Sequence, residues 1–138
     1  MTQNRFNELK NALRLQPKKW LVTGVAGFIG SNLLETLLKL DQEVVGLDNF
    51  ATGHQYNLDE VQSLVSSEQW TRFKFIEGDI RDRALLDKIF QQYPITAVVH
   101  FAGLKAVGES VAQPLRYYDN NVNGSITLFE AMEAAGVH

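Results

Sequence analysis

The sequence lacks cysteine altogether. This absence excludes disulfides, thiolate metal sites and cysteine nucleophiles, and it leaves the redox compartment undetermined. The sequence also lacks an apolar run long enough for a membrane span, and its polar N-terminus does not have the pattern of a signal peptide. A cytoplasmic location and no membrane partner are therefore the expectations.

The sequence also lacks a large excess of charge of one sign. The 138 residues carry 13 Lys and Arg against 16 Asp and Glu, a net charge of −3 with the two signs interspersed. Such a distribution offers no basic stripe to a nucleic-acid backbone, so we expect no nucleic-acid partner. A metal site is not predicted either, because His100 ends an apolar run with no second ligand at metal spacing.

What the sequence does contain is an alternation of short apolar runs with segments of helical periodicity. Such alternation predicts an α/β fold, a Rossmann-like doubly wound parallel sheet of about four strands that ends before a fifth. Gly136 is expected to cap the last helix, and Asp82 to cap the helix that it begins. The expected strands are 20–24, 43–48, 73–79 and 95–100, and the expected helices are 4–15, 29–40, 56–66, 82–92 and 115–135.

The stretch "VTGVAGFIGSN" places three glycines between the first strand and the following helix. Gly24, Gly27 and Gly30 have the spacing G-x-x-G-x-x-G, one residue longer at the start than the commoner G-x-G-x-x-G of dinucleotide-binding proteins. The first glycine permits a tight turn, the second a close approach of the backbone to a pyrophosphate, and the third close packing of helix on strand. The N–H groups of Phe28 and Ile29 then lie at a helix N-terminus, which favours an anion.

An acidic residue ends the second strand. Asp48 follows Gly30 by 18 residues, where a carboxylate can accept hydrogen bonds from both adenosine-ribose hydroxyls. The same charge would repel a 2′-phosphate, and the following "NFATG" has no arginine to neutralise one. The sequence therefore predicts NAD rather than NADP as cofactor. Residues 18–138 are expected to form an NAD-binding Rossmann half-domain, and residues 1–17 a helical appendage.

With these residues in view, the chain resembles the N-terminal part of the UDP-sugar 4-epimerases, in the extended short-chain dehydrogenase/reductase superfamily. Residues 1–99, with "GLDNFATGHQYNLDEV" and "FIEGDIRD", resemble the UDP-N-acetylglucosamine 4-epimerase branch. Residues 100–138, with "HFAGLKAVGESVAQPLRYYDNNVNG", resemble the UDP-glucose 4-epimerase branch. The chain thus reads as a chimera of two branches. A related 4,6-dehydratase is less well matched by "DNFATG" and "HFAGLKAVGES".

The resemblance implies a set of cofactor-binding residues along the loops that follow the four strands. Pyrophosphate contacts fall on the glycine loop, ribose and adenine contacts after the second and third strands, and contacts along the nicotinamide half after the fourth. Besides Gly24, Gly27, Phe28, Ile29, Gly30 and Asp48, the implied residues are Asn49, Phe50, Ala51, Thr52, Gly53, Asp79, Ile80, Phe101, Ala102, Gly103, Leu104, Lys105 and Asn120.

The resemblance also implies chemistry that these residues do not complete. The epimerases pass a hydride from sugar C4 to NAD and return it to the opposite face, using a serine or threonine and a tyrosine in Tyr-x-x-x-Lys. The residues four places after Tyr56, Tyr93, Tyr117 and Tyr118 are glutamate, alanine, asparagine and valine. No catalytic residue is therefore assigned, and the chain ending at His138 is expected to be an NAD-binding portion without turnover.

Two further interpretations of the function stay open. The chain could instead be a free-standing NAD- or nucleotide-binding module, or an engineered scaffold with no enzymatic role. In each case the fourth strand would present an unpaired apolar edge, which predicts a homo-oligomer formed through that edge. The partners expected are NAD and, in full-length relatives, a UDP-sugar.

Overall fold

Four parallel strands form the centre of the computed structural model, which describes residues 2–138. The strand order is β3-β2-β1-β4, so β1 lies inside the sheet and β4 at one edge. Pairing aligns Val22 of β1 with Gly46 of β2 and with Val99 of β4. The strands are β1 (Lys19–Thr23), β2 (Glu43–Asp48), β3 (Phe73–Glu77) and β4 (Ala97–His100).

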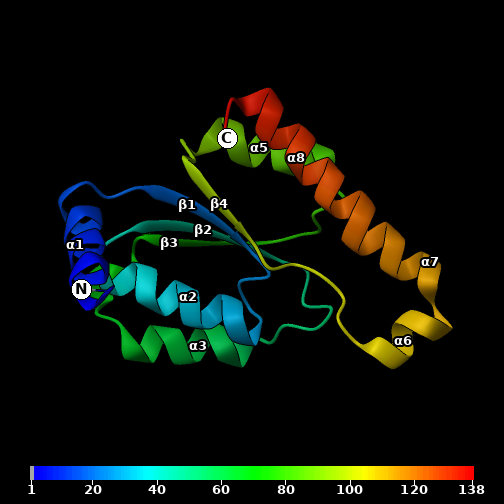
Figure 1. Ribbon diagram of the computed structural model, residues 1–138, viewed down its shortest axis with the longest axis horizontal. Coiled ribbons are helices and arrows are strands. Elements are labelled where there is room, and N and C mark those ends of the chain that lie inside the picture. Colours follow the sequence, from blue (N-terminus) through cyan, green and yellow to red (C-terminus); the bar gives the residue numbers. More distant parts are fainter. Residues whose placement is uncertain (1) are drawn as a thin grey trace.

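Helices cover both faces of this sheet, α2 and α3 on one and α5 and α8 on the other (Figure 1). This is the doubly wound arrangement that the alternating sequence predicted. The helices are α1 (Thr2–Leu15), α2 (Phe28–Lys39), α3 (Gln55–Leu64), α4 (Ser67–Trp70), α5 (Arg83–Gln92), α6 (Val107–Ala112), α7 (Pro114–Tyr117), the π-helix η1 (Tyr118–Asn123) and α8 (Gly124–Ala135).

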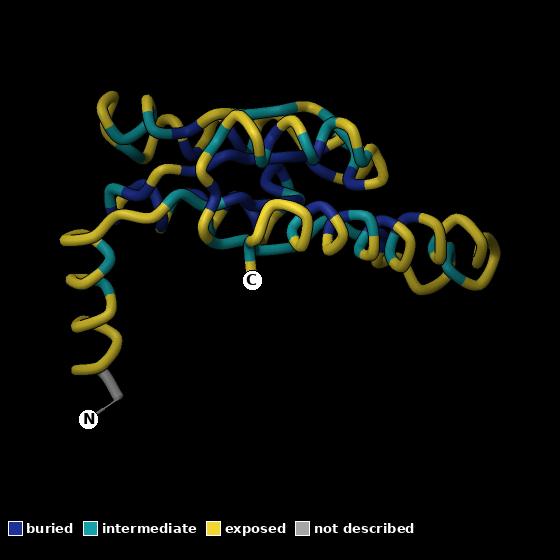
Figure 2. Tube along the Cα trace, turned by 90° about the horizontal axis from the view of Figure 1, so that it is seen from above, coloured by how far each residue is buried: buried dark blue, intermediate teal, exposed yellow. Residues whose placement is uncertain are grey.

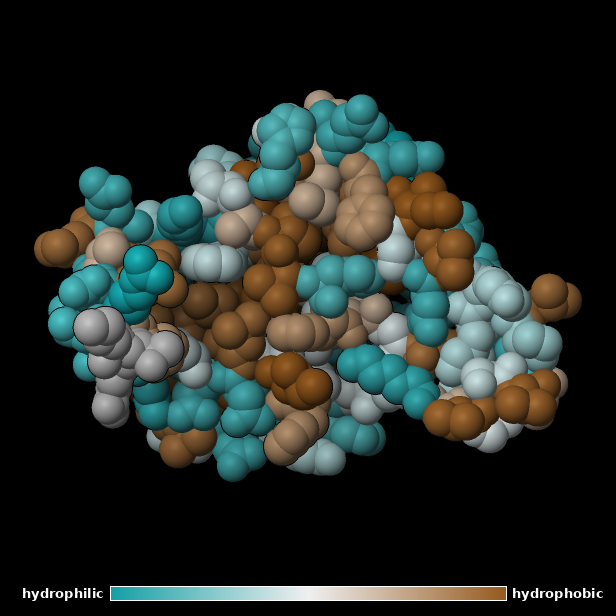
Figure 3. Space-filling view, in the orientation of Figure 1, coloured by the Kyte–Doolittle hydropathy of each residue, from teal (hydrophilic) through white to brown (hydrophobic). Residues whose placement is uncertain are grey.

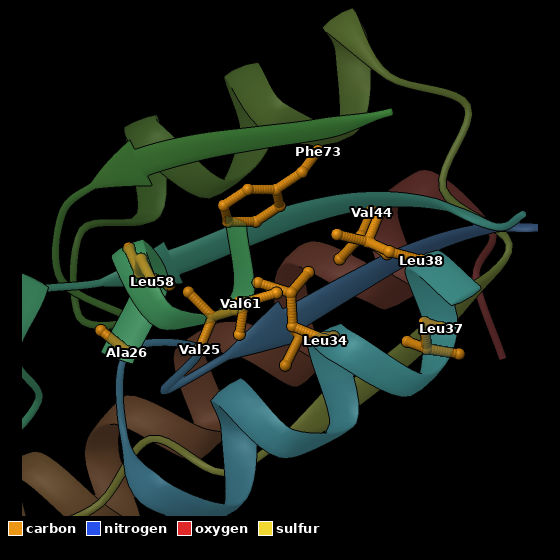
Figure 4. Close-up of a cluster of buried hydrophobic side chains, with 10 residues drawn as sticks. Val25, Ala26, Leu34, Leu37, Leu38, Val44, Leu58, Val61 and Phe73 are labelled. Carbon is orange, nitrogen blue, oxygen red and sulfur yellow. The ribbon is translucent and has the colours of Figure 1, made fainter. Parts of the chain in front are cut away.

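The core on the first face is built from the apolar stripe of α2 against alternate strand residues. Leu34 and Leu38 of α2 are fully buried, and they pack with Val44 of β2 and Phe73 of β3 (Figure 4). Helical spacing places both leucines on one side of α2, which is why a segment with this pattern folds onto the sheet. Burial of each such side chain contributes about 2 kcal/mol.

The core on the second face uses the neighbouring strand residues, which point the opposite way. Leu21 follows this rule on β1, as do Val45 and Leu47 on β2. They meet Leu86 of α5 and Leu128 of α8, both fully buried. Alternation of buried residues to both faces fixes the register of the strands, because a slip by one residue would exchange the two cores.

The N-terminal helix α1 stands away from the body of the molecule (Figure 2). Its attachment is made by Gln42, a fully buried side chain just before β2. The Gln42 amide nitrogen donates to the carbonyls of Leu13 and Leu40, at 2.9 and 2.8 Å. Its oxygen accepts from the Lys18 backbone N–H at 2.9 Å and the Trp20 indole N–H at 3.2 Å. All the hydrogen-bonding capacity of this amide is thus used at the junction.

A second projection is formed by α6 and α7 at the other end of the molecule (Figure 1). Figure 3 shows hydrophobic side chains gathered on its surface. Val107, Val111 and Leu115 are the large apolar residues exposed there. Helix α7 continues directly into η1 and α8, so this projection is the start of the long helical segment that returns over the sheet.

The strands and crossover helices expected from the sequence are present, and Gly136 has the left-handed conformation expected of a C-cap, with φ of 71°. Asp82 caps α5 as predicted, accepting from the Leu85 backbone N–H at 3.1 Å. The single helix expected over 115–135 is instead interrupted by the π-helix, and α4 and α6 were not predicted. Within residues 2–138, none of the helices has both the length and the apolar character needed to cross a bilayer.

Candidate functional site

A cavity of about 390 Å³ opens at the carboxyl ends of the strands. The chain passes from β1 outward to β2 and β3 and then returns to the other side of β1 with β4, so the strand order reverses beside β1. Ligands of open α/β sheets bind at this reversal, because neighbouring loops leave it in opposite directions. The lining comprises Gly24, Gly27, Phe28, Ile29, Gly30, Leu47, Asp48, Asn49, Ala51, Thr52, Gly53, Gly78, Ile80, Phe101, Ala102, Gly103, Leu104, Lys105, Ala106 and Asn120.

The glycine loop between β1 and α2 forms the floor of this cavity. Gly24 has a φ of 69°, a left-handed conformation that favours glycine, and a Cβ atom there would lie 2.7 Å from the Ala102 nitrogen. A Cβ atom at Gly30 would overlap the Gly24 carbonyl oxygen. The first glycine thus permits the turn and the third permits close packing, as the spacing predicted.

Gly27 differs from these two in degree, because a Cβ atom at this position would make one tight contact with the protein instead of overlapping it. The nearest atom to a Cβ there would be the Gly24 carbonyl oxygen, at 3.3 Å. Gly27 also lines the cavity. Space that is kept clear of a methyl group, beside a helix N-terminus, fits a ligand group that approaches the backbone closely.

The first turn of α2 presents free donors to the cavity. The Ser31 N–H donates to the Gly27 carbonyl at 2.9 Å, which begins the helical ladder. The N–H groups of Phe28, Ile29 and Gly30 precede that bond and have no acceptor in the described part of the chain. Gly27 provides no capping side chain. Three unpaired donors at a helix N-terminus make a site for an anion.

Asp48 lies at the end of β2 and joins the glycine loop to the next loop. Its Oδ2 accepts from the Ala26 backbone N–H at 2.9 Å, and its Oδ1 accepts from the Phe50 backbone N–H at 2.8 Å. A carboxylate oxygen can accept two hydrogen bonds, so each oxygen keeps one free position. Asp48 also lines the cavity, and only 8% of its surface is exposed.

The structure brings almost all the predicted cofactor residues to one cavity. The exceptions are Phe50 and Asp79, which do not line it. The Phe50 ring packs on Phe75, with centroids 5.3 Å apart, and Asp79 is held by Arg81 and Asn49. Lys105 is exposed at the rim, and Asn120 is buried in η1.

Two residues that were not singled out in the sequence position the loop after β4. The Thr23 hydroxyl oxygen accepts from the N–H groups of Phe101 and Ala102, at 3.1 and 3.2 Å. The Asn121 side chain forms two 2.8 Å hydrogen bonds with the backbone N–H and carbonyl of Leu104. Asn121 lies beside the predicted Asn120, but its role depends on a contact across 17 residues that no local pattern reveals.

A charged cluster flanks Ile80, which lines the cavity. Arg81 pairs with Asp79 at 2.8 Å and with Asp119 of η1 at 2.6 Å, so it connects the loop after β3 to the π-helix. The hydrogen bonds from Arg81 lower the pKa of Asp79 to about 2, and the same arginine lowers the pKa of Asp119. Both carboxylates are therefore charged at neutral pH, and they do not resemble proton-transferring acids.

Similarity to known proteins extends over most of the chain. A family model described as GDP-mannose 4,6 dehydratase matches residues 21–138. The chain belongs to this family. Within it, the chain corresponds to the N-terminal part of UDP-glucose 4-epimerases.

Two curated relatives illustrate the extent of the match. A UDP-glucose 4-epimerase of Neisseria meningitidis serogroup B is 51% identical over 120 residues, which are 87% of this chain and 34% of that protein. A UDP-glucose 4-epimerase of Klebsiella pneumoniae is 51% identical over 119 residues, 86% of this chain and 83% of that sequence. The chain thus spans about a third of the length of the first relative. The two-branch composition predicted for residues 1–99 and 100–138 stays a prediction.

Among solved structures, a UDP-glucose-4-epimerase from Stenotrophomonas maltophila superposes with a TM-score of 0.80 at 39% identity. The match covers 88% of this chain and 35% of that one, and that protein was crystallised with bound NAD and formylated UDP-arabinopyranose. The Rossmann-like fold predicted from the sequence is therefore confirmed by its relatives as well as by the strand order.

Proposed function

We propose that the chain binds NAD in the cavity at the carboxyl ends of the strands, as the cofactor-binding part of a UDP-sugar 4-epimerase. The observation that carries the proposal is the group of unpaired N–H donors at the start of α2, beside a glycine whose missing side chain leaves room for a ligand. A dinucleotide has an anionic pyrophosphate between two nucleosides, which matches a cavity with an anion site at its centre.

The pyrophosphate would lie on the Phe28 and Ile29 N–H groups, with Gly27 beneath it. No lysine or arginine is needed to hold it, because the backbone donors and the helix dipole provide the positive end. The side chains of Phe28 and Ile29 are exposed, by 80% and 54%. Their apolar surface would be covered in part by the ligand, which adds to the fit.

The adenosine would lie over the loops after β2 and β3, between Asp48 and Ile80. The free acceptor positions of the Asp48 carboxylate suit the two ribose hydroxyls, and Asn49 to Gly53 would follow the adenine side. Phe50 and Asp79 would act through their neighbours, since neither lines the cavity. Asp48 would repel a 2′-phosphate, so the site favours NAD over NADP.

The nicotinamide half would extend along residues 101–105 toward Asn120. Bound NAD supplies a hydride acceptor there. Thr23 and Asn121 fix the backbone on which this half would rest, and Lys105 would reach it from the rim. Residues 18–138 would then form one cofactor domain, with residues 1–17 as the appendage that Gln42 attaches.

Turnover requires residues beyond this set. None of the four tyrosines has a lysine four places later, so the 138 residues contain no Tyr-x-x-x-Lys pair to take the C4 hydroxyl proton. We infer that the isolated polypeptide binds cofactor without epimerising a UDP-sugar. A cytoplasmic location stays a prediction. The second candidate, a free-standing nucleotide-binding module, shares the cavity and differs only in lacking a sugar substrate.

Calorimetry with NAD tests the proposal. The expected result is saturable binding of NAD to the wild-type chain and much weaker binding of NADP. Gly27→Ala should fold with a small loss of stability, because its Cβ atom would lie 3.3 Å from the Gly24 carbonyl oxygen, a tight contact, and its methyl group should weaken NAD binding at least tenfold.

Gly108→Ala is the matched control, since Gly108 lies in α6 with nothing within 4 Å of an added Cβ. It should bind NAD as the wild type does. Absence of NAD binding to the folded wild type, or equal binding by Gly27→Ala, would overturn the proposed site. An assay of UDP-glucose and UDP-N-acetylglucosamine epimerisation checks the second inference, and detectable turnover by this chain would contradict it.

A further inference from the structure

His100 ends β4 at the point where the chain enters the loop that lines the cavity. The imidazole Nδ1 lies 2.6 Å from the Thr23 hydroxyl on β1, and Nε2 lies 3.0 Å from the Ser125 hydroxyl on α8. The sequence suggested only a histidine at the end of a sheet. The structure places it between two hydroxyl groups, each of which is itself tied to the backbone of a cofactor-site element.

The direction of each hydrogen bond follows from counting protons. The Thr23 hydroxyl oxygen accepts from the Ala102 N–H and shares the Phe101 N–H with the Thr23 carbonyl, which lies 3.0 Å from it. Among the described residues, Nδ1 of His100 is the one acceptor within reach of the Thr23 hydroxyl proton. The Ser125 hydroxyl donates to the Asn121 carbonyl at 2.6 Å, so it accepts from Nε2. His100 is thus neutral, with its proton on Nε2.

This series of bonds holds both ends of the cavity loop. Through Thr23 it fixes Phe101 and Ala102, and through Ser125 it reaches Asn121, whose side chain binds Leu104. A second proton, on Nδ1, would face the Thr23 hydroxyl proton. Thr23 would have to turn its hydroxyl proton away and accept from Nδ1 in competition with the Ala102 N–H, whose one acceptor among the described residues is this hydroxyl. The Phe101 N–H would keep the Thr23 carbonyl.

We propose that His100 is a positioning residue for the cofactor, because its neutral imidazole holds residues 101–104 in the conformation that forms the cavity wall. Protonation of His100 should therefore weaken the binding of NAD, and bound NAD should disfavour protonation of His100. This inference depends on the proposed NAD site, and it adds a residue that lies outside the cavity lining.

The surroundings of the imidazole are uncharged. Burial alone lowers the pKa of His100, and both groups that contact it are hydroxyls. Most of the titratable groups on the packed elements are paired. Lys19 on β1 pairs with Glu43, and Asp119 on η1 pairs with Arg81. On α5, Arg83 pairs with Asp87 and with Glu130 of α8. The other titratable groups on these elements are Glu133 of α8 and the exposed Lys88 of α5.

The first test needs neither variant nor cofactor. The ¹⁵N chemical shifts of His100 in the NAD-free chain at neutral pH should show the Nε2–H tautomer, and amide exchange of Ala102 should accelerate as the imidazole is protonated. A predominant Nδ1–H tautomer, or exchange at Ala102 that does not respond to protonation of His100, would overturn the proposal.

The second test measures the dissociation constant of NAD between about pH 5 and pH 8. Wild-type affinity should fall about threefold to tenfold on acidification, the effect of losing one hydrogen bond in the loop. His100→Asn keeps an acceptor for Thr23 but loses the bond to Ser125 and the titrating group, so its affinity at neutral pH should fall below that of wild type and its pH profile should be flat.

His54→Asn is the matched control, since His54 is an exposed histidine before α3 that stacks on Tyr56 and does not line the cavity. It should retain the wild-type pH dependence. A sloping profile in His100→Asn, or a flat one in His54→Asn, would contradict the proposal. If the wild type binds no NAD at any pH, the proposed function fails, and so does the expected weakening of NAD binding by protonation of His100. The tautomer measurement still decides whether His100 holds the loop.

Discussion

The backbone N–H of Ala26 donates a 2.9 Å hydrogen bond to the Asp48 carboxylate, across the junction of the first two strands. Asp48 is thus a structural anchor as well as the predicted ribose ligand, since its other oxygen holds the Phe50 N–H. A loss of NAD binding on removing this carboxylate would not by itself identify a ligand contact. The following predictions separate the two roles.

Asp48→Ala should weaken NAD binding and also lower the free energy of unfolding by about 1–3 kcal/mol, because two backbone donors lose their acceptor. Gly27→Ala should weaken binding with a smaller loss of stability than Asp48→Ala, because its Cβ makes one tight contact and removes no hydrogen bond. Urea denaturation beside calorimetry distinguishes these outcomes. Unchanged stability of Asp48→Ala would show that the two hydrogen bonds contribute nothing measurable.

Gly30→Ala should destabilise the fold by about 1–3 kcal/mol, since its Cβ would overlap a backbone carbonyl oxygen that cannot move without disturbing the turn at Gly24. Gly108→Ala, in open space on a helix, should be neutral or stabilising by up to about 1 kcal/mol. Thermal unfolding of both variants checks the difference. Equal melting temperatures would argue against the tight packing of α2 on the loop.

Gln42→Leu should lower the free energy of unfolding by at least about 2 kcal/mol, because four polar groups lose their partner at a buried position. It should also free α1, which proteolysis near residue 15 would detect. Gln91→Ala, on the exposed side of α5, serves as the control and should lie within about 0.5 kcal/mol of wild type. An α1 that stays protected in Gln42→Leu would refute the anchoring role.

Acid should remove the stabilisation that Asp79 derives from Arg81. The pKa of Asp79 is lowered from 3.8 to about 2 in the folded state, so the unfolded chain binds the proton first as the pH falls. The contribution is complete above pH 3.8 and is lost between that value and about 2. Asp79→Asn should flatten stability in this window, and the exposed Glu60→Gln should not. Denaturation midpoints measured across the window provide the test.

The exposed edge of β4 should make the chain self-associate, since unpaired backbone groups at a sheet edge template further pairing. Sedimentation at increasing concentration should show a dimer or larger species, and Val99→Lys should reduce it, because a charge on an edge strand opposes pairing. A monomer mass independent of concentration would count against this prediction.

Much of the fold could be predicted because its strands and crossover helices have strong periodicity. Leu34 and Leu38 mark one face of α2, and the apolar run ending at Thr23 marks a buried strand. The glycine loop could be predicted with its geometry, since the conformation of Gly24 and the packing of Gly30 are local requirements of a strand–turn–helix unit.

The parts of the fold and of the site that could not be predicted depend on contacts between residues far apart in the sequence. Helical periodicity over 115–135 could not reveal the π-helix, where Asn121 turns toward Leu104 and Asn120 toward the cavity. Thr23 has no sequence signature either, because a threonine at a strand end is common. Its function depends on two N–H groups that β4 brings beside it from 78 and 79 residues away.

The π-helix between Tyr118 and Asn123 has a consequence for how this segment tolerates change in length. A π turn holds an extra residue relative to an α turn, so deleting one residue there would restore regular winding. The helices on its two sides would keep nearly the same relative bearing, because the extra residue is wound into that single turn, and the side chains within the turn would change direction. Asn120, which lines the cavity, and Asn121, which binds Leu104, both lie in this turn, so a deletion of one residue there should disturb the cavity wall while α8 stays docked on α5.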